Sequence, residues 1–209
     1  MSPNQLTTLK SFDEIEKTLW ENYQILETFK SATEEFVKRV NNTVQIWAAS
    51  RDWFLEEWGR DTFISLPGLL LVTGRYEDAR KVFERFAKYE RNGLIPNRIV
   101  GSKIEYNSAD SSLWFIQALK KYVKYTDDWK FVSKIAPTVN NILKSYVNGT
   151  GYERYGKFQK IYMDDDYLIV NPPQATWMDA DAFGKIDPVT PRNGKAVEIN
   201  SLFYSSLKF

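Results

Sequence analysis

The stretch DTFISLPGLLLV, residues 61–72, is mostly apolar and carries no alternation of apolar and polar side chains. A helix that is apolar around most of its circumference is buried by the elements around it. Pro67 is expected to kink this helix because proline has no amide hydrogen to donate. Gly74 is expected to end it. The stretch therefore predicts a buried helix at the centre of the fold.

Apolar residues recur at spacings of three and four on both sides of this stretch, which is the pattern of amphipathic helices. Residues 152–193 are polar, rich in Pro and Asp, and without a sustained period, and only a short hairpin within residues 158–170 fits there. The sequence does not show the alternation of strands and helices that would suggest a parallel sheet. The sequence predicts an all-α fold class, as a single domain over residues 1–209. The expected helices cover residues 11–26, 31–40, 61–72, 78–90, 108–124, 128–146 and 196–207.

The charge of the chain is nearly balanced, with 28 basic and 27 acidic residues among 209. There is no cationic surplus of the kind that binds nucleic acid or anionic lipid. The N-terminus lacks the basic and apolar regions of a signal peptide, and the apolar runs are too short to span a bilayer. We therefore expect a cytoplasmic protein with neither nucleic acid nor membrane as a partner.

The chain contains no Cys and no His, which excludes disulfides, thiol nucleophiles, most transition-metal sites and imidazole-dependent triads. What remains is mainly carboxylate chemistry, with no cofactor and no metal expected. Aromatic residues make up 15% of the chain, with seven Trp, and many lie beside Gly, Asp, Asn or Arg. Aromatic rings beside polar side chains suit a sugar, because the rings stack on its apolar face and the polar groups bond its hydroxyls. Composition alone favours the alternative of a large aromatic core.

Two motifs precede predicted helices. In the first, Arg60 and Asp61 place a planar donor fork beside a carboxylate, a pair able to hold vicinal sugar hydroxyls; alternatively Asp61 caps the helix and Arg60 pairs with Glu57. In the second, the residues Glu105, Tyr106 and Asn107 come before Ser108 and Asp110, which capping explains. The alternative for these three residues is an ordinary solvated loop.

Two further motifs lie towards the C-terminus. Asp179 follows Trp177 by two positions, and an acid desolvated by an indole can hold its proton near neutral pH; an Asx-turn or a helix cap is the alternative. Asp181 is either a coupled partner or solvated. In the last motif Lys195 and Glu198, with Asn200, open the final helix, where routine capping is the alternative.

Taken together and in this order, the four motifs resemble the C-terminal domain of glycogen debranching enzymes, the amylo-α-1,6-glucosidase family, including its archaeal and bacterial glucoamylase-like members. The similarity extends from about Trp53 to Leu207. Several separate motifs in one order are more specific than any single motif. They are WGRDT at 58–62, GLIPNR at 93–98, EYN at 105–107, TWMDA at 176–180 and the segment from Gly194-Lys195 to Asn200.

The resemblance implies an (α/α)6 barrel, of which this chain would form about half. It implies a glycoside hydrolase that removes α-1,6-linked, and in part α-1,4-linked, terminal glucose from branched glucans such as glycogen, with inversion. Asp179 would be the general acid, and Arg60 with Asp61 would hold the non-reducing terminal glucose. The surrounding subsites would be lined by Trp58, Trp177, Glu105, Tyr106, Asn107, Lys195 and Glu198.

Inversion requires a second carboxylate, about 6.5–9.5 Å from the acid, to activate water. In the family this base comes from a much later helix, so no residue here is carried over as the base, and spacing supports neither Glu105 nor Glu198. The rest of the barrel is expected from a longer chain or a second polypeptide, and the family's N-terminal sugar-binding domain is not expected here. Two alternatives stay open, namely another (α/α)6 glycosidase such as a trehalase or mannosylglycerate hydrolase, and a non-catalytic glycan-binding subunit.

Overall fold

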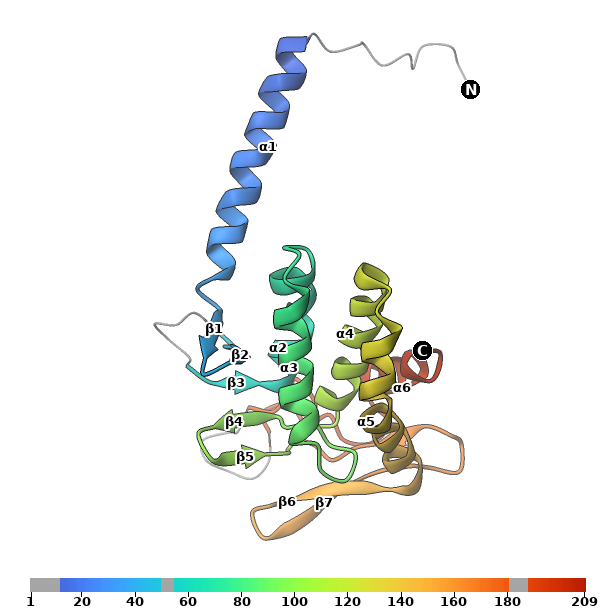
Figure 1. Cartoon of the computed structure of the whole chain (residues 1–209). Coiled ribbons are helices and arrows are strands. Elements are labelled where there is room, and N and C mark those ends of the chain that lie inside the picture. The colour runs from blue at the N-terminus through green and yellow to red at the C-terminus, as the bar shows by residue number, and fades with distance from the viewer. Residues whose placement is uncertain (1–11, 50–54, 181–187) are drawn as a thin grey trace, which may run out of the picture.

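The computed structural model of the chain describes residues 12–49, 55–180 and 188–209. Four helices, α2 to α5, stand beside one another, and most of the strands gather at one end of them (Figure 1). Helix α1 extends away from this body (Figure 1). Ser11, Trp53 and Asp181 lie outside the described residues.

The predicted helices are present, with ends shifted by a few residues. The sequence leaves Asp127 and Asp128 as alternative caps of the helix predicted over residues 128–146, and the structure selects Asp128, whose carboxylate accepts a hydrogen bond of 3.1 Å from the Phe131 amide. The segment predicted as helix over residues 31–40 is the exception. The helices are α1 (Phe12–Thr33), α2 (Gly59–Leu66), the π-helical η1 (Pro67–Leu71), α3 (Tyr76–Lys88), α4 (Ser111–Thr126), α5 (Trp129–Asn148) and α6 (Val197–Leu207).

The predicted kink lies where helix α2 passes into η1. Pro67 is the first residue of η1, and its carbonyl accepts a hydrogen bond of 3.0 Å from the Val72 amide five residues on. Proline removes one donor from the regular ladder and its ring crowds the preceding turn, so a wider turn at this point is expected. Leu66, Leu70 and Leu71 are fully buried around the junction. The stretch is a central helix, as predicted, but it changes winding at Pro67.

The core between helices α2, α3 and α4 is built of aromatic rings. The ring centroid of Phe63 lies 5.7 Å from that of Phe83, 4.9 Å from that of Phe86 and 5.0 Å from that of Phe115. Two of these contacts are edge-to-face, an arrangement that aromatic quadrupoles favour. A substantial part of the aromatic content is therefore core, as the alternative interpretation of the composition held.

The all-α prediction is wrong, and with it the description of the chain as half of a purely helical barrel. The described residues contain three small antiparallel sheets besides the helices, so the fold is mixed α and β. The sheets are ordered β1-β2, β3-β4-β5 and β6-β7-β8. The strands are β1 (Val37–Val40), β2 (Thr43–Ile46), β3 (Glu57–Trp58), β4 (Arg98–Val100), β5 (Lys103–Glu105), β6 (Thr150–Arg154), β7 (Lys157–Met163) and β8 (Ile169–Val170).

Two-residue turns explain why these strands form. Asn41 and Asn42 both have positive φ, 46° and 65°, and so do Tyr155 and Gly156, at 51° and 71°. Gly101, with φ of 58°, opens the turn between β4 and β5. Turns with left-handed residues match the twist of paired strands and so form tight hairpins. The hairpin expected within residues 158–170 is present as the antiparallel pair of β7 and β8. The other short strands give little periodic signal, which is why the sequence pattern predicted loops or helix there.

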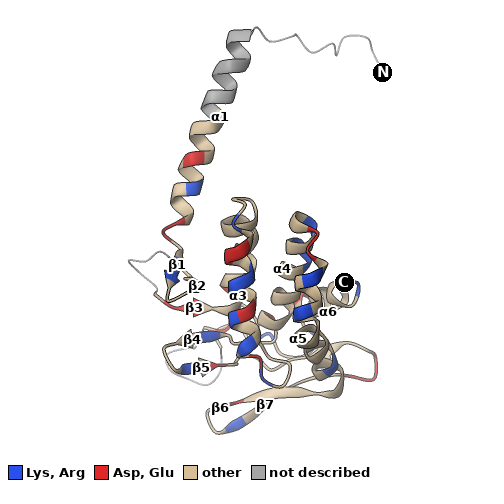
Figure 2. Ribbon diagram, viewed as in Figure 1, with Lys and Arg blue, Asp and Glu red and all other residues tan. Residues whose placement is uncertain are grey.

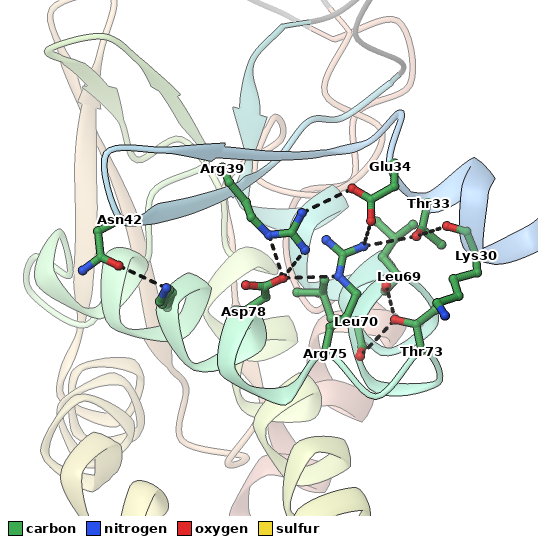
Figure 3. A network of polar contacts seen from close by, with 11 residues as sticks. Lys30, Thr33, Glu34, Arg39, Asn42, Leu69, Leu70, Thr73, Arg75 and Asp78 are labelled. Atoms are coloured by element: carbon green, nitrogen blue, oxygen red, sulfur yellow. Dashed lines mark hydrogen bonds and ion pairs between the residues drawn. The ribbon is translucent and has the colours of Figure 1, made fainter.

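The hairpin β1-β2 is attached to helix α3 by a charged network (Figure 3). The Asp78 carboxylate accepts hydrogen bonds from Arg39 Nη2 at 2.6 Å and from Arg75 Nε at 3.2 Å. Arg75 Nη1 also donates to the Glu34 carboxylate at 2.9 Å. Asp78 therefore joins the first hairpin to the start of α3.

The surface and the helices agree with the charge balance of the sequence. Basic and acidic residues are interspersed along helix α3 rather than separated (Figure 2). Within the part of the chain that the structure describes, no helix combines the length and the apolar character needed to cross a bilayer.

Candidate functional site

The N-termini of helices α2 and α4 meet where strand β4 begins. The Gly59 amide donates a hydrogen bond of 2.9 Å to the Asn97 carbonyl. A Cβ at position 59 would lie 2.1 Å from the Pro96 carbonyl oxygen, closer than any real contact. Only glycine allows this approach. The glycine of the WGRDT motif thus places Arg60 directly beside the start of α4.

Arg60 lies at the centre of a carboxylate cluster. Its guanidinium donates to both oxygens of Asp110, with Nε–Oδ2 of 2.6 Å and Nη2–Oδ1 of 3.1 Å. The remaining nitrogen, Nη1, lies 3.2 Å from Asp179 Oδ2. The alternative pair with Glu57 does not form, because Glu57 is buried against Arg85 with Nη2–Oε2 of 2.6 Å.

Asp110 is a member of the cluster that the motif reasoning explained away as a helix cap. The Ser108 hydroxyl performs that task, accepting from the amides of Asp110 at 3.3 Å and Ser111 at 3.0 Å. The Asp110 carboxylate is therefore available to Arg60, and it is almost completely buried. An aspartate two residues after a capping serine was the sequence signal for this site residue. A role at the helix N-terminus explained the same aspartate more simply.

Asp179 occupies a largely buried position, with 23% of its side chain exposed. Burial raises the pKa of its carboxyl, and the attraction and hydrogen bond of Arg60 oppose this rise without cancelling it. For Arg60, burial alone would lower the pKa, but Asp110 and Asp179 together raise it. Asp110 holds Arg60 through two hydrogen bonds and only one reaches Asp179, so burial outweighs the attraction of Arg60 and the pKa of Asp179 stays raised.

Asp61 shares the electrostatic field of this cluster. Burial raises the pKa of its carboxyl, with Arg60 lowering it and the charges of Asp110 and Asp179 raising it further. Three carboxyl groups thus share one guanidinium, and burial outweighs its attraction at both Asp61 and Asp179.

The EYN motif lines a cavity of about 600 Å³. Glu105 is held by Lys103 at 2.5 Å and by Arg98 at 3.6 Å, and these cations lower the pKa of its carboxyl against the effect of burial. The Tyr106 hydroxyl donates to the Tyr89 carbonyl at 2.8 Å. The structure therefore gives Glu105 and Tyr106 internal partners while leaving one face of the motif on the cavity.

The two tryptophans of the motifs are placed differently. The guanidinium of Arg98 lies over the Trp58 ring at 5.4 Å, and Trp58 Nε1 donates to the Glu56 carboxylate at 3.3 Å. Trp177 is 58% exposed, so its indole presents a large surface to solvent. Trp58 is fixed in place by its neighbours, whereas Trp177 is a surface ring.

Lys195 and Glu198 take part in ion pairs of their own. Lys195 Nζ lies 2.7 Å from carboxylate oxygens of both Asp164 and Asp166. Glu198 accepts from Arg192 Nε at 2.6 Å, which lowers the pKa of its carboxyl. Within the described residues, neither side chain forms a hydrogen bond or ion pair with Arg60 or Asp179. The structure brings together Arg60, Asp61 and Asp179, but it does not add these two residues to the cluster.

The family model of the amylo-α-1,6-glucosidases matches residues 31–209. The chain belongs to the amylo-α-1,6-glucosidase family. It is also 29% identical over 206 aligned residues to the glycogen debranching enzyme of Saccharomyces cerevisiae. That similarity covers 75% of this chain and 13% of the yeast protein, so the chain spans about an eighth of its curated relative.

The residues that match the amylo-α-1,6-glucosidase family model include the whole candidate site. The matched residues include both hairpins beside the cavity and all four members of the Arg60 cluster, whereas nearly all of helix α1 precedes them. The carboxylate cluster and the cavity thus lie in the part of the chain that defines the family.

Proposed function

We propose that the intact protein is a debranching glycoside hydrolase that removes α-1,6-linked terminal glucose from branched glucans with inversion, and that Asp179 is its general acid. One observation carries the proposal, namely the largely buried Asp179 carboxyl with a raised pKa in a member of the amylo-α-1,6-glucosidase family. A general acid must hold its proton near the working pH and release it to the leaving oxygen. Burial favours the protonated form of Asp179.

Arg60 and Asp61 are proposed to hold the terminal glucose. Asp61 follows Arg60 in the first turn of α2, and its half-buried carboxyl offers acceptors for sugar hydroxyls. Arg60 is committed to Asp110 on one edge, so we propose that it mainly fixes the orientation of Asp179 and of the sugar beside it.

The other motif residues are proposed to form outer subsites. Trp58 and Trp177 offer aromatic faces, and Glu105, Tyr106 and Asn107 offer polar groups along the cavity. Lys195 and Glu198 are proposed to shape a subsite through their ion pairs with neighbouring loops. Neither Glu105 nor Glu198 is proposed as the base, since both carboxylates are bound by cations.

The test is hydrolysis by the intact protein carrying Asp179→Asn. With panose as substrate, kcat is expected to fall by about 10²–10⁴, the usual contribution of general acid catalysis. With α-glucosyl fluoride, which needs no proton to expel its leaving group, the same variant should retain most of its turnover. Asp165→Asn, in an exposed turn, is the control and should change neither rate.

Near wild-type turnover of panose by Asp179→Asn would refute the role of Asp179. Equal losses on panose and on the fluoride would instead indicate a structural defect and count against proton donation. The anomer of the first glucose released, followed by NMR, reports inversion directly.

A further inference from the structure

The cavity beside the EYN motif has a second wall that the motif reasoning did not include. This wall is the hairpin β6-β7, which contributes Gly151, Tyr152, Arg154, Tyr155 and Phe158. The volume of about 600 Å³ lies within the range of small-ligand pockets, ~300–1,000 Å³. Aromatic rings alternate with charged and amide groups around it, the combination that suits a sugar.

Phe158 forms part of the rim. Its side chain is 59% exposed, and its ring lies against Gly151, where an added Cβ would come within 2.8 Å of the ring. The missing side chain at Gly151 therefore leaves room for the ring along the cavity wall. Next to it, the guanidinium of Arg154 lies 5.2 Å from the ring centroid of Tyr155, which helps to hold that ring in place.

Tyr152 is the most buried of the hairpin residues that line the cavity. Its side chain is 6% exposed, and among the described residues no group makes a hydrogen bond with its hydroxyl. A buried hydroxyl without a partner costs about 1–3 kcal/mol. Burial raises the pKa of this phenol above its usual range, Arg154 opposes the rise, and the charges of Asp179 and Asp110 add to it. The hydroxyl therefore has unused capacity for a hydrogen bond.

The Arg60 cluster adjoins the cavity through the segment 105–110. Asn107 lines the cavity and lies three residues before Asp110, which accepts from Arg60 at 2.6 Å, and Arg60 Nη1 lies 3.2 Å from Asp179. Arg60 and Asp61 themselves are not part of the cavity lining. If the terminal glucose lies at Arg60 and Asp61, a sugar on the Tyr152 side of the acid belongs to the part of the substrate that leaves. The general acid protonates the oxygen between these two parts.

We propose that this cavity binds the leaving portion of the glucan, with the Tyr152 hydroxyl bonding the sugar nearest the cleaved linkage and the Phe158 ring stacking on a sugar further along. The inference rests on the proposed function for its orientation. It adds the hairpin β6-β7 to the site as the element that senses the length of the leaving chain.

Hydrolysis tests the orientation. In the intact protein, Phe158→Ala should lower kcat/KM for panose, whose leaving group has two sugars, by about tenfold. For isomaltose, whose leaving group is one sugar, the change should stay within about twofold. Tyr152→Phe should lower kcat/KM for both substrates by roughly tenfold, the effect of one hydrogen bond. Tyr204→Ala, whose ring is also 59% exposed but lies on α6, and Tyr122→Phe, at a buried tyrosine bonded to Arg80, are the controls.

Local binding is measured separately, without turnover. In the Asp179→Asn protein, maltotriose should slow hydrogen exchange in the hairpin over residues 150–163, and Phe158→Ala should abolish that protection. The inference is overturned, and the proposed function stands, if panose is hydrolysed but Phe158→Ala changes neither the panose-to-isomaltose ratio nor the hairpin protection. The same conclusion follows if Tyr152→Phe leaves kcat/KM for both substrates unchanged. If panose is not hydrolysed while maltotriose still protects the hairpin, the proposed function fails and the cavity remains a glucan site.

Discussion

The carboxyl groups around Arg60 differ in how strongly the guanidinium holds them. Asp110 receives two hydrogen bonds from Arg60, and Asp179 receives one, at 3.2 Å. The unequal pairing makes Arg60 a stronger partner for Asp110 than for Asp179, so burial dominates the pKa of the Asp179 carboxyl. Two aspartates in one cluster can therefore have different tasks.

The raised pKa of Asp179 predicts a pH-dependent stability difference between the wild type and Asp179→Asn. The folded carboxyl binds its proton more tightly than the unfolded one, whose pKa is about 3.9. The contribution of Asp179 to the unfolding free energy should therefore fall as pH rises from about 4 through the folded pKa, and then level off. The Asp179→Asn variant has no group that titrates at this position. Its unfolding free energy relative to that of the wild type should therefore rise over this pH range. Denaturant unfolding from pH 4 to 8 measures it.

Asp61 has a raised pKa too, and because the charge of Asp179 adds to that rise, the stability difference includes the coupling between the two carboxyl groups. A stability difference that does not change with pH would show that the carboxyl of Asp179 titrates as it does in the unfolded chain.

At the scale of elements, we predict that position 59 tolerates no residue larger than glycine. Gly59→Ala should lower the unfolding free energy by about 1–3 kcal/mol, because the added methyl meets the Pro96 carbonyl and must push α2 away from β4. The same shift should displace Arg60 and reduce turnover of panose. Thermal unfolding and the panose assay check both effects.

Gly68→Ala, at the second residue of η1, is the matched control. No atom lies within 4 Å of a Cβ built there, so alanine should stabilise the protein by about 0.4–1 kcal/mol. Equal stability and activity of the two variants would contradict the packing argument for Gly59.

The sequence was informative about helices and much less so about strands. Long periodic segments such as the one that became α5 have a strong signal, and Asp128 was one of the two caps that the sequence allowed. The hairpins depend on two-residue turns, and Asn41-Asn42 was the overlooked signal, because Val37 and Val40 fit a helix as well as a strand. Local pattern alone does not decide between them when the apolar run is this short.

For the site, the sequence and the family resemblance anticipated Arg60 and Asp179, 119 positions apart, which the structure brings to within 3.2 Å. Asp110 and Tyr152 were missed for physical reasons. The first has an ordinary capping explanation, and the second is a tyrosine in a polar stretch whose burial depends on a hairpin that pattern reasoning did not predict. Burial depends on tertiary packing, so the spacing of residues along the sequence does not reveal it.

At the scale of the whole molecule, Asp78 predicts how firmly the first hairpin is attached to the helices. Burial raises the pKa of its carboxyl, but the hydrogen bonds of Arg39 and Arg75 outweigh burial, so the folded pKa is lowered. Its stabilisation is therefore present above pH ~4 and is lost as pH falls through the folded value. Asp78→Asn should cost about 1–2 kcal/mol at pH 7, reduced by salt because Arg39 is half exposed.

Glu77→Gln, on the same turn of α3, is the comparison for this experiment. Glu77 is 74% exposed in its pair with Arg80, so its loss should cost less than about 0.5 kcal/mol. Urea unfolding at pH 7 and pH 3 measures both variants. A cost for Asp78→Asn that is as large at pH 3 as at pH 7 would argue against the charged network.

Helix α1 has a consequence for the hydrodynamic shape of the chain. Its 22 residues make a rod of about 33 Å that extends away from the body (Figure 1). A compact globule of 209 residues would have a radius of gyration of about 17 Å. With the rod extended, small-angle scattering from the isolated chain should give a clearly larger radius and an asymmetric distance distribution. Leu26 and Phe29, each more than 60% exposed along the rod, would then make the chain self-associate as its concentration rises.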